Sequence, residues 1–169
     1  SSEEMLRTVE ELIKEARKRL DESLEEVRKR IEDAKRRHEE SNDENRRLVE
    51  DAKRRVNTEE AKKRIDEVLK KSEEVNRKAK KDLDEVLKEH ERVIRRIKKE
   101  LDEVLEKVRR LGEDKDVLEE LREIIDRLRR ESEDSLRRLE KIIKDSEDRS
   151  RESSEELKEI IKRLLEEDK

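Results

Sequence analysis

The chain lacks cysteine, proline and all three aromatic residue types, and it contains a single glycine. The absence of cysteine excludes disulfides, thiolate metal ligands and a cysteine nucleophile. Without aromatic rings there is no platform for stacking nucleobases and no aromatic anchor for a binding site. The sequence also has no apolar run long enough to span a bilayer and no targeting signal, so it does not indicate a location.

Charge dominates what is present. Of the 169 residues, 49 are Lys or Arg and 53 are Asp or Glu, which makes the chain 60% charged and 28% hydrophobic. Composition alone is typical of a disordered polyelectrolyte. The net charge of −4 gives no strong field to attract nucleic acid or an anionic membrane, so we expect neither as a partner.

The order of the residues contradicts the disordered interpretation. In the first third of the chain, apolar and small residues are spaced alternately by three and four, which keeps one face of an α-helix apolar. The residues between them are mostly Glu, Lys and Arg, which are good helix formers. The positions are Leu6, Val9, Ile13, Ala16, Leu20, Leu24, Val27, Ile31 and Ala34.

Residues suited to helix ends divide the chain into three helices, at about 2–56, 58–111 and 114–168. Gly112 stands where a helix C-terminus requires a left-handed residue. Connections this short force consecutive helices to run antiparallel, so we predict one all-α domain over 1–169, an up-down-up three-helix bundle. The candidate N-caps are Ser1 or Ser2, Asn57 or Thr58, and Asp114 or Asp116.

An 18-residue repeat runs through each predicted helix. In the second helix the segment at Ile65 reads IDEVLKK, and it recurs as LDEVLKE at Leu83 and LDEVLEK at Leu101. One such repeat completes a whole number of helical turns, so the apolar stripe does not drift around a straight helix. The repeat therefore predicts an elongated, nearly untwisted bundle.

Polar residues interrupt the repeat at positions that should face the core. Asn42 stands where the other copies have Leu6 and Leu24, and Asn76 corresponds to Ile94. In an up-down-up bundle, residue n of the first helix should lie near residue 114 − n of the second and n + 112 of the third. The interruptions then gather at shared levels. One predicted cluster contains Ser23, His90, Ser135 and Ser132, and the other contains His38, Ser41, Asn42, Asn45, Ser72, Asn76, Ser146, Ser150, Ser153 and Ser154.

Such clusters suit a buried hydrogen-bond network. A buried polar group without a partner costs about 1–3 kcal/mol, whereas a complete network avoids that cost. A complete network also disfavours other helix registers, because a slip would place Asn or His against Leu. The sequence leaves open whether the larger cluster is continuous or split, and which serines face the core.

The 18-residue repeat, the absence of aromatics, the Glu/Lys/Arg surface, the minimal loops and the polar layers together resemble computationally designed helical bundles with buried hydrogen-bond networks. The resemblance covers the whole chain and carries no catalytic residues. It implies a structural scaffold whose networks specify helix pairing and which has no natural biochemical activity. Natural long three-helix proteins of the spectrin-repeat type are less similar, since they usually have core aromatics and irregular loops.

The remaining interpretations concern the two histidines and the apolar stripe. Neither His38 nor His90 has a carboxylate or second histidine three or four residues away, so we expect no metal, no other cofactor and no catalytic residues. Burial of a neutral histidine would make the bundle acid-sensitive, which is the basis of an alternative function as a pH-responsive module. We expect a monomer that requires no partner; helical self-association, as a subunit of a larger assembly, is the other alternative.

Overall fold

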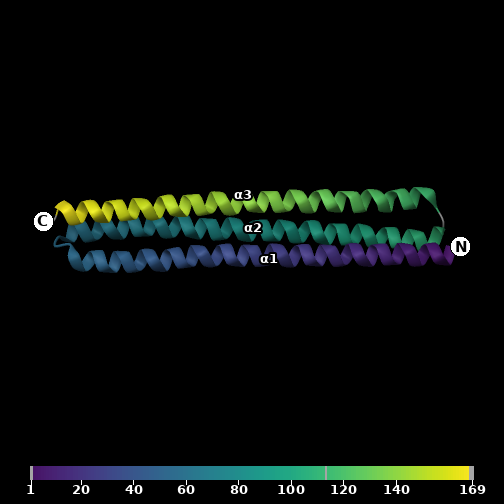
Figure 1. Cartoon of the computed structure of the whole chain (residues 1–169), viewed down its shortest axis with the longest axis horizontal. Coiled ribbons are helices and arrows are strands. Elements are labelled where there is room, and N and C mark those ends of the chain that lie inside the picture. The colour runs from purple at the N-terminus through teal and green to yellow at the C-terminus, as the bar shows by residue number, and fades with distance from the viewer. Residues whose placement is uncertain (1, 113, 168–169) are drawn as a thin grey trace. The chain divides into compact units, whose positions relative to one another are not determined.

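The computed structural model describes residues 2–112 and 114–167, which form three α-helices joined by two short connections. The helices are α1 (Ser2–Arg55), α2 (Glu59–Leu111) and α3 (Lys115–Glu167) (Figure 1). They pack against one another, and no strand occurs among the described residues, so the predicted all-α three-helix bundle is confirmed. The predicted internal helix ends lie within one residue of those observed, whereas the predicted end at 168 and the cap at Ser1 lie outside the described residues.

Three residues fix the two connections. The Thr58 hydroxyl oxygen accepts a hydrogen bond from the Ala61 backbone N–H at 3.1 Å and so caps α2. The Asp114 carboxylate caps α3, accepting from the Asp116 N–H at 2.9 Å. Gly112 has a φ of 66° and donates its N–H to the Val108 carbonyl at 2.9 Å, which ends α2 in a left-handed conformation.

The chain forms two compact units, and each helix contributes a segment to both. Unit 1 contains Ser1–Lys29 and Val86–Leu139, and unit 2 contains Arg30–Glu85 and Glu140–Lys169. Each unit is therefore a bundle of three helical segments. The prediction of a single domain over 1–169 remains a prediction.

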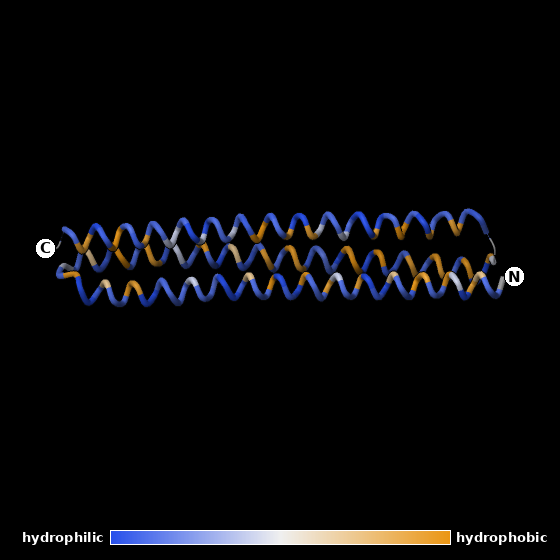
Figure 2. The backbone as a smooth tube through the Cα atoms, viewed as in Figure 1, coloured by the Kyte–Doolittle hydropathy of each residue, from blue (hydrophilic) through white to orange (hydrophobic). Residues whose placement is uncertain are grey.

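Unit 1 has an almost wholly apolar core. Val9, Leu20, Leu101 and Val104 are among its most deeply buried side chains. Ion pairs flank this core where α2 meets each neighbour: Arg17 of α1 binds Asp102, and Arg127 of α3 binds Glu100. Apolar residues recur along each helix, as the orange bands of Figure 2 show.

Unit 2 combines an apolar cluster with a polar layer. The cluster gathers around Val49, Ile65 and Leu157, near the connection between α1 and α2. In the polar layer, histidine, asparagine and serine side chains occupy core positions and are buried. This layer is the candidate functional site.

Candidate functional site: two buried polar clusters

A continuous chain of side-chain hydrogen bonds joins nine polar residues in unit 2. All three helices contribute, so the bonds cross every helix–helix interface of the unit. No charged side chain belongs to the network, which is therefore held by neutral donors and acceptors. Its members are His38, Ser41, Asn42 and Asn45 of α1, Ser72 and Asn76 of α2, and Ser146, Ser150 and Ser154 of α3.

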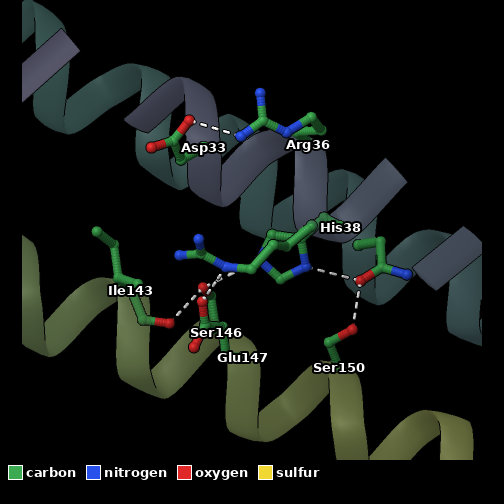
Figure 3. A network of polar contacts seen from close by, with 9 residues as sticks. Asp33, Arg36, His38, Ile143, Ser146, Glu147 and Ser150 are labelled. Carbon is green, nitrogen blue, oxygen red and sulfur yellow. Dashed lines mark hydrogen bonds and ion pairs between the residues drawn. The ribbon is translucent and has the colours of Figure 1, made fainter. Parts of the chain in front are cut away.

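Asn76 is the centre of the network. Its side chain is fully buried, and its Oδ1 accepts hydrogen bonds from His38 Nδ1 at 2.8 Å and from the Ser150 hydroxyl at 2.7 Å. Its Nδ2 donates to Asn42 Oδ1 at 2.6 Å. One amide thus links α2 to both neighbouring helices, and Figure 3 shows His38 of α1 opposite Ser146 and Ser150 of α3.

His38 has an acceptor at each ring nitrogen. Its Nδ1 faces Asn76 Oδ1, and its Nε2 lies 3.1 Å from Ser146 Oγ. The Ser146 hydroxyl donates its only proton to the Ile143 carbonyl at 2.9 Å, so its oxygen faces the ring as an acceptor. A neutral imidazole has one N–H, so it can donate to only one of these two acceptors. Its other nitrogen needs a donor, which the Ser146 hydroxyl supplies if it rotates away from Ile143, or the Asn76 amide supplies if its oxygen and nitrogen exchange places.

The network continues through serine hydroxyls to a third asparagine, Asn45. Ser41 lies 3.3 Å from Ser150 Oγ and 3.4 Å from Ser154 Oγ. Asn45 Nδ2 donates to Ser154 Oγ at 3.1 Å and to Ser72 Oγ at 2.9 Å. Nine of the ten residues in the larger predicted cluster therefore form one continuous network, which leaves out Ser153.

The observed bonds differ from the predicted levels in two places, one on α3 and one on α2. His38 pairs with Asn76 of α2 at the predicted level, but its partner on α3 is Ser146, one helical turn before the predicted Ser150. Asn42 bonds to Asn76, whereas Ser72 was the predicted neighbour. Hydrogen-bonded pairs of α1 and α3 such as His38–Ser146, Ser41–Ser150 and Asn45–Ser154 are 108 or 109 residues apart, whereas the predicted levels assumed 112, so α3 is displaced along α1 by about one helical turn.

Unit 1 contains the smaller cluster, which is incomplete. His90 is buried, and its Nε2 lies 3.3 Å from the Ser23 hydroxyl. Its Nδ1 is buried and has no hydrogen-bond partner among the described residues. Burial lowers the pKa of His90, the nearby positive charge of Arg138 lowers it further, and Glu91 opposes both effects.

Three predicted site residues make no side-chain hydrogen bond among the described residues. Ser135 is buried in the same unit as His90 but has no bonded partner. Ser132 and Ser153 are half-buried. Serine spacing alone placed all three at core-facing positions, but it could not distinguish side chains that bond across helices from those at the edge of the core.

Ion pairs between helices of unit 2 were not predicted from the sequence. Arg37 of α1 binds Glu147 of α3 at 2.7 Å next to His38, and Lys35 binds Asp84 of α2 at 2.9 Å. In a sequence that is 60% charged, an interhelical pair gives no signal that separates it from a solvated charge.

Comparison with known proteins gives no relative for this chain: no family model, no curated protein and no solved structure matches it. The described residues contain no group of three or more His, Asp or Glu side chains placed to hold a metal ion. None of the described helices has a segment apolar enough to cross a membrane.

Proposed function

We propose that this chain is a designed structural scaffold without catalytic activity, and that its buried polar network fixes the register of its helices. The observation that carries the proposal is the nine-residue network, whose bonds join all three helices of unit 2. The lack of a matching family is compatible with a designed origin. The regular 18-residue repeat and the minimal loops support the same conclusion.

The regular repeat allows the helices to pack in more than one register, and the network distinguishes between these registers. An apolar stripe that recurs in every copy of the repeat packs almost equally well after a slip of one copy. Such a slip would replace His38 with Leu20 or Val56 opposite Asn76. The Asn76 amide would then be buried against an apolar side chain, at a cost of about 1–3 kcal/mol for each group left without a partner.

Removing the network while keeping the apolar stripe tests this function. The variant carries at five network positions the residue found at the same place in a neighbouring repeat: His38→Leu, Asn42→Leu, Asn45→Val, Asn76→Ile and Ser146→Leu. Spin labels on Glu44→Cys and Glu155→Cys, both exposed and on different helices of unit 2, then report the distance between α1 and α3. The chain has no other cysteine, so labelling is specific.

We expect one narrow distance distribution for the labelled parent and a broad or divided one for the variant, with helicity retained. Ser153→Val is the matched control, because it adds an apolar side chain in unit 2 without removing a hydrogen bond. A variant with the parent's single narrow distribution would show that the apolar stripe alone sets the register, and would refute the proposal.

A pH-responsive module is a second candidate function, favoured by the unpartnered Nδ1 of His90. Protonation would place a second donor and a charge beside Arg138 of α3 and the uncharged Ser23 of α1, an effect that Glu91 of α2 opposes. Cooperative loss of helicity on mild acidification, absent in His90→Gln, would support this function. Equal stability of the parent at neutral and mildly acidic pH would exclude it.

A further inference from the structure

Two of the three exposed large apolar side chains in the described residues line one groove. Leu12 of α1 is 47% exposed and Leu118 of α3 is 37% exposed; the third, Leu111, lies at the end of α2. In a chain with 28% hydrophobic residues, exposure of two leucines at one place departs from the pattern of burial elsewhere.

The groove runs between α1 and α3 within unit 1. It consists of two adjoining hollows of about 350 and 400 Å³ that share Leu12 and Ile125 in their linings. Met5 and Leu118 line the first, and Leu128 and Leu136 line the second. On α3 the lining residues Leu118, Ile125 and Ser132 recur at a heptad spacing, which presents a seam to another helix.

Ion pairs cross the other two interfaces of unit 1 at the level of the groove. Ion pairs join α1 to α2 at Arg17–Asp102 and Lys98–Asp21. Others join α2 to α3 at Lys107–Glu120 and Arg96–Glu131. Along the groove from Leu12 to Glu22, no ion pair crosses from α1 to the described side chains of α3, so the apolar floor stays open there.

The two walls of the groove carry opposite charges at matched positions. Glu15, Arg19 and Glu22 line the α1 wall, and Arg122, Asp126 and Arg129 line the α3 wall. Each charge on one wall corresponds to the opposite charge on the other, and the separation along the chain is the same for all three pairs. The next pair, Glu26 and Glu133, is acidic on both sides and ends the complementary stretch.

We propose that a second copy of this chain docks in the groove, about a two-fold axis parallel to the helices. Such an axis sets α1 of one copy against α3 of the other at the same level. Glu15, Arg19 and Glu22 then meet Arg122, Asp126 and Arg129 of the second copy, and Leu12 packs against the second copy's Leu118. The proposal does not depend on the scaffold function or on the polar network.

Charge selects both the occupant and its orientation. A two-fold interface requires a surface that is complementary to itself, and two walls of opposite charge at matched levels meet that requirement. A two-fold axis perpendicular to the helices and centred at the level of Arg19 would instead bring α1 against α1, with Glu15 facing Glu22 of the second copy. A foreign helix would have to supply both charge patterns on its own two edges.

Sedimentation equilibrium from micromolar to millimolar concentration tests the proposal. We expect the mass to rise from that of a 20.6 kDa monomer toward twice that value. Leu12→Glu combined with Leu118→Glu should keep the chain monomeric throughout, with helicity unchanged because both side chains are exposed. Leu111→Glu is the matched control, since Leu111 is an exposed leucine outside the groove, and it should dimerise like the parent.

A charge exchange tests the orientation. Glu22→Arg and Arg129→Glu should each weaken the dimer about tenfold, because two like-charged pairs form per dimer, and the double variant should restore it. A chain that stays monomeric at every concentration would overturn the proposal, as would a dimer that the groove substitutions leave intact. A monomer whose Leu12 and Leu118 NMR signals shift on adding a leucine-heptad peptide would assign the groove to a foreign helix and overturn the second-copy proposal.

Discussion

Replacing Asn76 with leucine tests how much the central amide of the network contributes to stability. Asn76→Leu keeps a side chain of similar size but removes three hydrogen bonds, to His38 Nδ1, Ser150 Oγ and Asn42 Oδ1. The three partners differ in how easily each replaces its lost hydrogen bond. Ser150 lies 3.3 Å from Ser41 and can turn its hydroxyl there, and Asn42 is 9% exposed and reaches water. His38 is only 2% exposed, so its Nδ1 can reach neither another hydroxyl partner nor water.

These differences set the expected magnitude. A buried group without a partner costs about 1–3 kcal/mol, so we assign about 2 kcal/mol to His38 and about 1 kcal/mol to each of the other two. Burial of the leucine side chain in place of the amide offsets about 2 kcal/mol of that total. The net expectation is a loss of about 2 kcal/mol in the free energy of unfolding.

Urea unfolding followed by far-ultraviolet circular dichroism measures this loss. The matched experiment makes the same substitution in a background that carries His38→Leu, Asn42→Leu and Ser150→Ala. There the amide has lost its three partners, so Asn76→Leu should be neutral or stabilising. Equal destabilisation in both backgrounds would show that the amide acts through packing and not through its hydrogen bonds, and would refute the reasoning.

Three further predictions concern the second histidine and the connections. Because the pKa of His90 is lowered in the folded state, the unfolded chain binds more protons as pH falls below about 6.5; stability should therefore decrease from there until the folded-state pKa is passed. His90→Gln should flatten that dependence in urea melts at stepped pH, and an unchanged slope would assign the acid sensitivity to other groups. Thr58→Ala should lower the unfolding free energy by about 1 kcal/mol through loss of the α2 cap, with Thr58→Ser close to the parent in the same melts. Gly112→Ala should cost about 1 kcal/mol from its positive φ alone, since an added Cβ would meet no atom within 4 Å; a larger loss by thermal melting would indicate that the connection has to rearrange.

The helices and their ends were predictable because they depend on local physics. Apolar residues at alternating spacings of three and four share one face only in an α-helix. Thr58, Gly112 and Asp114 mark the helix ends through their own side chains or backbone. Candidate polar residues were also visible in the sequence, because a strict repeat makes each interruption stand out. Asn76 attracts attention only because Ile94 stands at the same place in the next repeat.

The pairing of those polar residues was less predictable. Whether His38 meets Ser146 or Ser150 depends on a shift of one helical turn between α1 and α3, and sequence spacing constrains that shift only to within a turn. Whether the Nδ1 of His90 and the hydroxyl of Ser135 find hydrogen-bond partners likewise depends on distances between side chains of different helices. The open groove at Leu12 and Leu118 could not be recognised either, since flanking leucines also occur in closed bundles.

The sequence by itself determined that the chain is helical, where its helices begin and end, and which polar residues interrupt the apolar repeat, because each of these follows from periodicity and capping within a single helix. Only the tertiary structure decided which polar atoms meet, that nine residues form one network while His90 keeps an unpartnered nitrogen, and that α1 and α3 leave an apolar groove open in unit 1. These outcomes depend on the rotation and axial offset of packed helices to within a few ångströms, a precision at which a hydrogen bond forms or fails.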